Sequence, residues 1–73
     1  MEVFQITDQE FIELKDLLKV TGLCSTGGAS KKAITEGRVK VDGNVEMRKR
    51  SKIRAGQVVE YDGMKITVKS LFR

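Results

Sequence analysis

The second half of the chain contains two Asp-Gly pairs. Each pair lies next to a segment in which apolar and polar residues alternate. Val39 and Val41 alternate with cations before Asp42-Gly43, and a similar alternation follows Asp62-Gly63. Asp-Gly favours two-residue hairpin turns, whose central positions need positive φ angles. We therefore expect an antiparallel sheet with tight turns and with strands at 38–41, 57–61 and 64–69.

The first half of the chain has helical periodicity instead. A short strand is expected at 3–6, and Thr7 and Glu10 then match a capping box, in which each side chain bonds to the other residue's backbone amide. Apolar residues at helical spacing follow over 11–18. This pattern predicts a helix of about 12 residues that ends at Gly22.

A second helix is predicted after Ser25 and Thr26, which are both suitable N-cap residues. Its expected core face contains Ala29, Ala33 and Ile34, and Gly37 is expected to end it. The combined patterns predict an α+β fold, with two helices packed on a small, mostly antiparallel sheet of short strands.

The length of 73 residues predicts a single domain over 1–73, which buries only about 60% of its unfolded surface. Because Cys24 is the one cysteine and histidine is absent, an internal disulfide and the usual zinc sites are excluded. We expect Cys24 to be a small buried apolar residue. No apolar run has the length of a signal peptide or membrane span. We expect a cytoplasmic monomer without a cofactor, a metal or a small-molecule substrate.

Positive charge is concentrated in the middle of the chain. Residues 31–54 contain nine basic and three acidic residues, whereas residues 1–30 have a net charge of −3 and residues 55–73 of +1. This uneven distribution of charge indicates a polyanionic partner more strongly than the net charge of +4 does.

The densest basic cluster comprises Arg48, Lys49, Arg50 and Lys52, followed by Arg54. One interpretation is a solvated loop that keeps the protein soluble. The other is an RNA-binding segment, because nucleic acid phosphates relieve the repulsion between neighbouring cations and release counterions. Tyr61 and the phenylalanines are expected in the core and not as base-stacking platforms, because none of them lies within this segment.

The start of the second helix is another candidate site. Ser25, Thr26 and Gly27 can act as an ordinary cap, or their region can bind a phosphate at the helix N-terminus. Lys31 and Lys32 follow one turn later and could contact the same anion.

Arg38 and Lys40 alternate with the valines of a predicted strand. They are consistent with the polar face of an edge strand, where lysine also opposes aggregation. This interpretation is compatible with a role in binding RNA.

The chain offers little for catalysis. It has no histidine to activate Cys24 and no glycine-rich phosphate loop of the Walker or dinucleotide type. We therefore expect a non-enzyme without catalytic residues. The alternative to RNA binding is a protein-interaction module that uses the acidic side of the first helix or the tail around Leu71 and Phe72.

The order and spacing of many residues resemble the S-four-like RNA-binding domain, or alpha-L motif, and in particular its stand-alone bacterial YbcJ-type subfamily. The same motif occurs in a small-subunit ribosomal protein, in bacterial tyrosyl-tRNA synthetases and in pseudouridine synthases. The resemblance covers about residues 12–69. Its most specific part lies in residues 36–43 and 48–57. The matching positions are Leu14, Leu17, Leu18, Gly22, Ser25, Ala29, Ala33, Ile34, 37–43, Val45, Ile53 and 56–58.

The resemblance implies binding to structured RNA, usually ribosomal or transfer RNA, through the second helix and the loop and strands that follow. Transferred to this chain, the RNA-binding surface comprises Ser25, Thr26, Gly27, Lys31, Lys32, Arg38, Lys40, Arg48, Lys49, Arg50 and Lys52. Many family members have an arginine directly after the serine that starts this helix, but here Thr26 follows. We therefore expect contacts at this end to involve backbone amides and Lys31 or Lys32.

Overall fold

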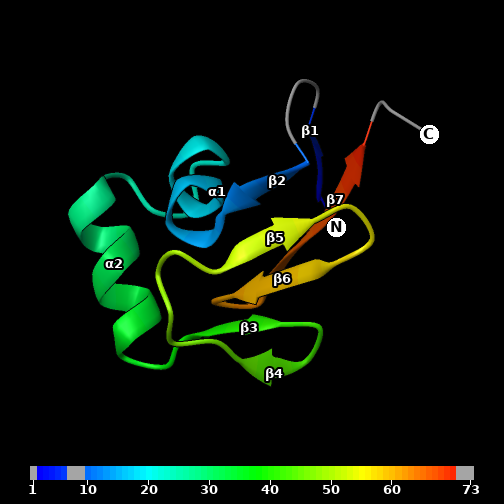
Figure 1. The fold of residues 1–73 in the computed structure, drawn as a ribbon. Coiled ribbons are helices and arrows are strands. Elements are labelled where there is room, and N and C mark those ends of the chain that lie inside the picture. Colours follow the sequence, from blue (N-terminus) through cyan, green and yellow to red (C-terminus); the bar gives the residue numbers. More distant parts are fainter. Residues whose placement is uncertain (1, 7–9, 71–73) are drawn as a thin grey trace.

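A five-stranded sheet forms one layer of the molecule (Figure 1). The computed structural model describes residues 2–6 and 10–70. The strand order is β1-β7-β6-β3-β4, and only the β1–β7 pair is parallel. The strands are β1 (Glu2–Ile6), β3 (Val39–Val41), β4 (Asn44–Val45), β6 (Val58–Tyr61) and β7 (Met64–Ser70).

Both predicted hairpins are confirmed. The turn between β3 and β4 has φ values of 52° at Asp42 and 86° at Gly43, and the turn between β6 and β7 has 53° at Asp62 and 80° at Gly63. Two successive positive φ angles are typical of the type I′ turn, whose twist suits a two-residue hairpin.

The first helix is shorter than predicted. Helix α1 (Leu14–Val20) is preceded by strand β2 (Phe11–Glu13), which pairs antiparallel with β5 (Lys52–Arg54). The prediction was wrong over these three residues because pairing with β5 places Ile12 opposite the buried Ile53. Thr7 of the predicted capping box lies outside the described residues, and the actual N-cap, Glu13, makes no side-chain capping bond.

The second helix begins and ends close to the predicted positions. Helix α2 (Gly27–Thr35) has Thr26 as its N-cap, and Gly37 follows its end with a φ of 74°. Ala29 is exposed, however, and Ser30 takes the expected inward position together with Ala33 and Ile34. The prediction for Ala29 was wrong because the buried stripe of this helix runs through 30, 33 and 34.

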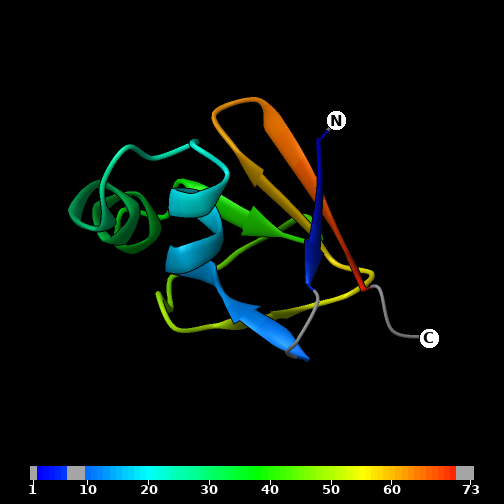
Figure 2. The same ribbon diagram turned by 90° about the horizontal axis from the view of Figure 1, so that it is seen from above.

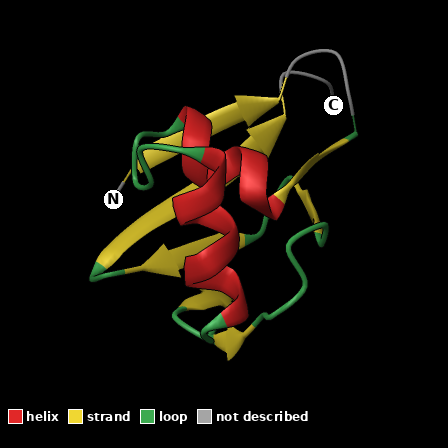
Figure 3. Cartoon of the chain, turned by 90° about the vertical axis from the view of Figure 1, so that its left-hand side faces the viewer, coloured by secondary structure: helices red, strands yellow, loops and turns green. Residues whose placement is uncertain are grey.

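The two helices cover one face of the five-stranded sheet, and the core lies between these layers (Figures 2 and 3). The core residues are Leu14, Leu17, Leu18, Ala33 and Ile34 from the helices, Ile6, Ile12, Val39, Ile53, Val59, Ile66 and Val68 from the strands, and Cys24 from the segment between the helices. Lys40, Glu60 and Lys65 form a cross-strand row between these inward positions. This row belongs to the opposite face, because side chains alternate along a strand. No helix among the described residues is long and apolar enough to cross a membrane.

Ser30 provides a polar connection between the helices. Its side chain is fully buried, and its hydroxyl donates a 2.7 Å hydrogen bond to the Lys15 carbonyl oxygen in α1. The small hydroxyl therefore combines close packing with a satisfied hydrogen bond.

We expect Ser30→Ala to lower the free energy of unfolding by about 1–2 kcal/mol, because it removes a buried hydrogen bond between helices. Urea denaturation measures this change. Thr35→Ala is the matched control, because its hydroxyl is exposed and bonds within α2. Its expected effect is below about 0.5 kcal/mol. Equal effects of the two substitutions would contradict the role given to Ser30.

Candidate nucleic-acid interface

Residues 46–51, here called the basic loop, connect β4 to β5 and are held by backbone hydrogen bonds. The loop carbonyls of Ser51 and Lys49 accept from the amides of Leu14 and Lys15 at 2.9 and 3.1 Å. At the other end, the Glu46 amide donates to the Val39 carbonyl at 2.9 Å. The first amides of a helix lack partners within it, so the loop satisfies the N-terminus of α1.

An ion pair further orders the basic loop. The Arg48 Nε donates to Glu46 Oε2 at 3.0 Å, and the Arg48 Nη2 lies 3.5 Å from Oε1. The Arg48 amide and the Ser51 hydroxyl also donate to this carboxylate, at 3.1 and 3.3 Å. Hydrogen bonding and charge from Arg48 lower the pKa of Glu46 despite its partial burial, and the same pair raises the pKa of Arg48. Glu46 therefore compensates the charge of Arg48.

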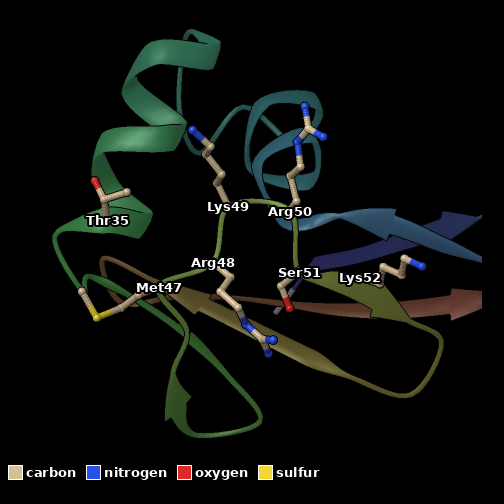
Figure 4. Close-up of a pocket in the computed structure, with 7 residues that line it drawn as sticks. All are labelled: Thr35, Met47, Arg48, Lys49, Arg50, Ser51 and Lys52. Carbon is tan, nitrogen blue, oxygen red and sulfur yellow. The ribbon is translucent and has the colours of Figure 1, made fainter.

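Unlike Arg48, Lys49 and Arg50 have no acidic side chain among the described residues that compensates their charge. Both are exposed, and among residues 2–6 and 10–70 neither forms an ion pair. In Figure 4, Lys49 extends beside α2 and Arg50 toward α1, whereas Arg48 points away from both over the sheet. The basic triplet is thus divided into two cations without acidic partners and one anchored guanidinium.

An open depression of about 700 Å³ lies between the end of α2 and the basic loop (Figure 4). It is lined by Thr35, Met47, Arg48, Lys49, Arg50, Ser51 and Lys52. The structure therefore brings four of the predicted RNA-binding residues, Arg48, Lys49, Arg50 and Lys52, to one hollow. Thr35 and Met47 were not among the predicted site residues, because no local pattern indicates that the end of a helix faces this loop.

Five of the predicted RNA-binding residues lie in α2 or directly before it. Thr26 accepts a hydrogen bond from the Ala29 amide at 3.0 Å and so acts as an ordinary cap. Ser25 and Thr26 are exposed, as are Lys31 and Lys32, whereas Gly27 is half-buried. A helix of nine residues is about 13 Å long, so the N-terminus is about that far from Thr35 at the depression.

The other two predicted residues lie away from the depression. Arg38 pairs with Glu36 at 3.6 Å, and its guanidinium lies 5.6 Å from the centre of the Tyr61 ring. Lys40 is exposed on the face of the sheet that the helices do not cover, and its strand β3 pairs with both β4 and β6, so it is not the edge strand that was expected. A single flat surface therefore does not contact both Lys40 and the depression.

Phe11, which was expected in the core, lies beside the basic residues of β5. The Lys52 ammonium is 4.9 Å and the Arg54 guanidinium 5.7 Å from the centre of this half-buried ring. The sequence gives no sign of this contact, because it depends on the pairing of β2 with β5.

Cys24 has the expected buried position. It is 5% exposed, and burial raises the pKa of its thiol, although Tyr61 and Arg38 oppose the shift. A protonated, enclosed thiol is a poor nucleophile and a poor metal ligand. No group of three or more potential metal ligands occurs in the part of the chain that is described.

The fold and the match to a known domain family define the class of this protein. The chain belongs to the S4 domain family, which matches residues 4–69. Its helices and mostly antiparallel sheet form the alpha-L motif, so the predicted family and fold are confirmed.

Two related proteins are similar over almost the whole chain. "Putative RNA-binding protein YbcJ" of Escherichia coli K12 and "Uncharacterized protein YbcJ" of Shigella flexneri are each 48% identical over 68 residues, covering 93% of this chain and 97% of theirs. The solution structure of E. coli YbcJ, described as revealing an alpha-L motif involved in RNA-binding, superimposes with a TM-score of 0.74. That match covers 94% of this chain and 87% of the other.

We expect Glu46 to titrate below its ordinary pKa of 4.5 in the folded protein. A carboxyl with a lowered folded-state pKa stabilises the protein above its unfolded pKa, and this stabilisation is lost as the pH falls through the folded value. Carboxyl-carbon NMR measures the midpoint. Arg48→Ala should move the Glu46 midpoint upward, whereas Lys49→Ala should leave it nearly unchanged. A midpoint insensitive to Arg48→Ala would disprove this pairing in solution.

Proposed function

We propose that this chain is a non-catalytic RNA-binding module that holds structured RNA, either ribosomal or transfer RNA. The observation that carries the proposal is the pair of exposed cations, Lys49 and Arg50, on a loop fixed by backbone hydrogen bonds to α1. Membership of the S4 domain family and the similarity to YbcJ support RNA as the polyanion.

The geometry of the basic loop suits phosphate binding. Lys49 and Arg50 lack acidic partners among the described residues, so their charges are available to an RNA backbone. Because the loop carbonyls already bond to α1, the loop needs little ordering on binding, which lowers the entropic cost. Displacement of counterions from the phosphates then favours association and makes it sensitive to salt.

Helix α2 extends the proposed surface from the depression toward its own N-terminus. Lys31 and Lys32 supply exposed charges along the helix, and Ser25, Thr26 and Gly27 supply polar groups where it begins. A surface of this kind contacts the backbone and 2′-hydroxyls of folded RNA and recognises shape more than sequence.

The first helix gives little support to the alternative function, a protein-interaction module. Lys15 lies 3.2 Å from Asp16 and 3.5 Å from Glu13, so much of the expected acidic surface is neutralised internally. The hydrogen bond to Asp16 and the charges of both acids raise the pKa of Lys15, although burial lowers it. The tail at 71–73 lies outside the described residues.

We expect Lys49→Ala with Arg50→Ala to weaken binding to a folded transfer RNA on the order of tenfold at low salt. The slope of log affinity against log salt should fall by about 1–2, because up to two phosphate contacts are lost. Fluorescence anisotropy at several salt concentrations measures both quantities, and thermal unfolding followed by circular dichroism checks the fold.

The matched control is Lys65→Ala with Lys69→Ala, which removes the same charge from exposed positions of β7. This control should change affinity and slope much less, because neither lysine lines the depression. Equal losses in the two double variants would show that net charge governs binding, and the proposed surface would then be wrong.

A further inference from the structure

Arg48 has a geometry that differs from that of a phosphate-binding arginine. Its Nε–H and one Nη–H point at Glu46, at 3.0 and 3.5 Å, so one of the two guanidinium edges that can fork onto a phosphate is occupied. The nearby carboxylate also compensates the positive charge. The side chain is nevertheless 82% exposed.

The flat face of the Arg48 guanidinium remains available, beside the three N–H groups that do not contact Glu46. Unpaired RNA bases stack on arginine planes as well as on aromatic rings. Stacking uses the face and not the N–H edge, so it is compatible with the bond to Glu46. The carboxylate holds the plane in one orientation, and less side-chain freedom is lost when a base arrives.

The surrounding depression is suited to one nucleotide. Its volume of about 700 Å³ lies in the range of sites for single small molecules. Apart from Met47, which is 56% exposed, the lining residues are polar or charged, but most of the surface that they turn toward the hollow is apolar and suits the face of a base. Lys49 and Arg50 line the same hollow but extend away from Arg48 (Figure 4), where phosphates next to that nucleotide can reach them.

We propose that Arg48 stacks on a single unpaired base of the bound RNA, so that this protein prefers a paired stem with an extruded nucleotide to a continuous duplex. This inference rests on the proposed function and adds to it the structural class of the target. Glu46 acts as a positioning residue, because it orients Arg48 without touching the base.

The test compares two RNA hairpins with the same stem, one fully paired and one with a single unpaired 2-aminopurine. We expect the protein to bind the second about threefold to tenfold more tightly, in line with the energies of cation–π and stacking contacts. Stacking on Arg48 should also change the 2-aminopurine fluorescence on binding. Arg48→Lys keeps the charge but removes the plane, so the preference and the fluorescence change should both disappear.

Arg54→Lys is the matched control, because Arg54 is likewise exposed and paired with a carboxylate, Glu10 at 3.6 Å, but does not line the depression. It should retain the preference within about twofold, because the positive charge is kept and no guanidinium plane at the depression is lost. If Arg54→Lys and Arg48→Lys reduce the preference equally, the assignment to Arg48 is overturned. Binding to both hairpins without preference overturns this inference alone, whereas no binding to either overturns the proposed function as well.

Glu46→Gln provides a second variant, in which Arg48 is present but its ionic anchor is weakened. The preference for the unpaired base should fall, and affinity for the fully paired hairpin should rise because the guanidinium becomes free to contact phosphate. An unchanged preference would show that anchoring by Glu46 does not orient Arg48, against the proposal.

Discussion

The hydrogen bonds between the N-terminus of α1 and the carbonyls of the basic loop are the contact on which the candidate site depends. Helix α1 has only seven residues, and its N-cap offers no side-chain bond, so it cannot be stable on local interactions alone. Ser51 and Lys49 supply the missing acceptors. The loop backbone is thereby turned inward, while its charged side chains extend outward. Folding of α1 and presentation of the proposed binding surface consequently depend on the same hydrogen bonds.

Acidic neighbours give the basic residues different roles. Glu46 anchors Arg48, and Glu36 and Glu10 lie 3.6 Å from Arg38 and Arg54, respectively. Ion pairs this exposed contribute little to stability. Their effect is to orient side chains and to lower the local charge. Lys49 and Arg50 are the cations of the basic loop for which residues 2–6 and 10–70 supply no acidic partner. A binding site that combines oriented and freely charged groups suits a ligand with both bases and phosphates.

Much of the fold was predictable because its signals are local. The Asp-Gly turns depend on the φ angles of two residues, and the end of α2 on the conformation of Gly37. The errors involve partners distant in sequence. Residues 11–13 had apolar residues compatible with a helix, but pairing with β5 made them a strand. Ala29 and Ser30 are neighbours on α2, and only packing against α1 decides which of them is buried.

The sequence by itself determined the family, the α+β architecture, the hairpins and the concentration of positive charge in the middle third. These follow from short-range backbone preferences and from the order of residue types. Tertiary structure alone decided that Glu46 anchors Arg48, that the end of α2 meets the basic loop at the depression, and that Phe11 contacts the cations of β5. Side-chain pairing and strand register depend on where distant segments meet, and a charge pattern along a chain does not contain that information.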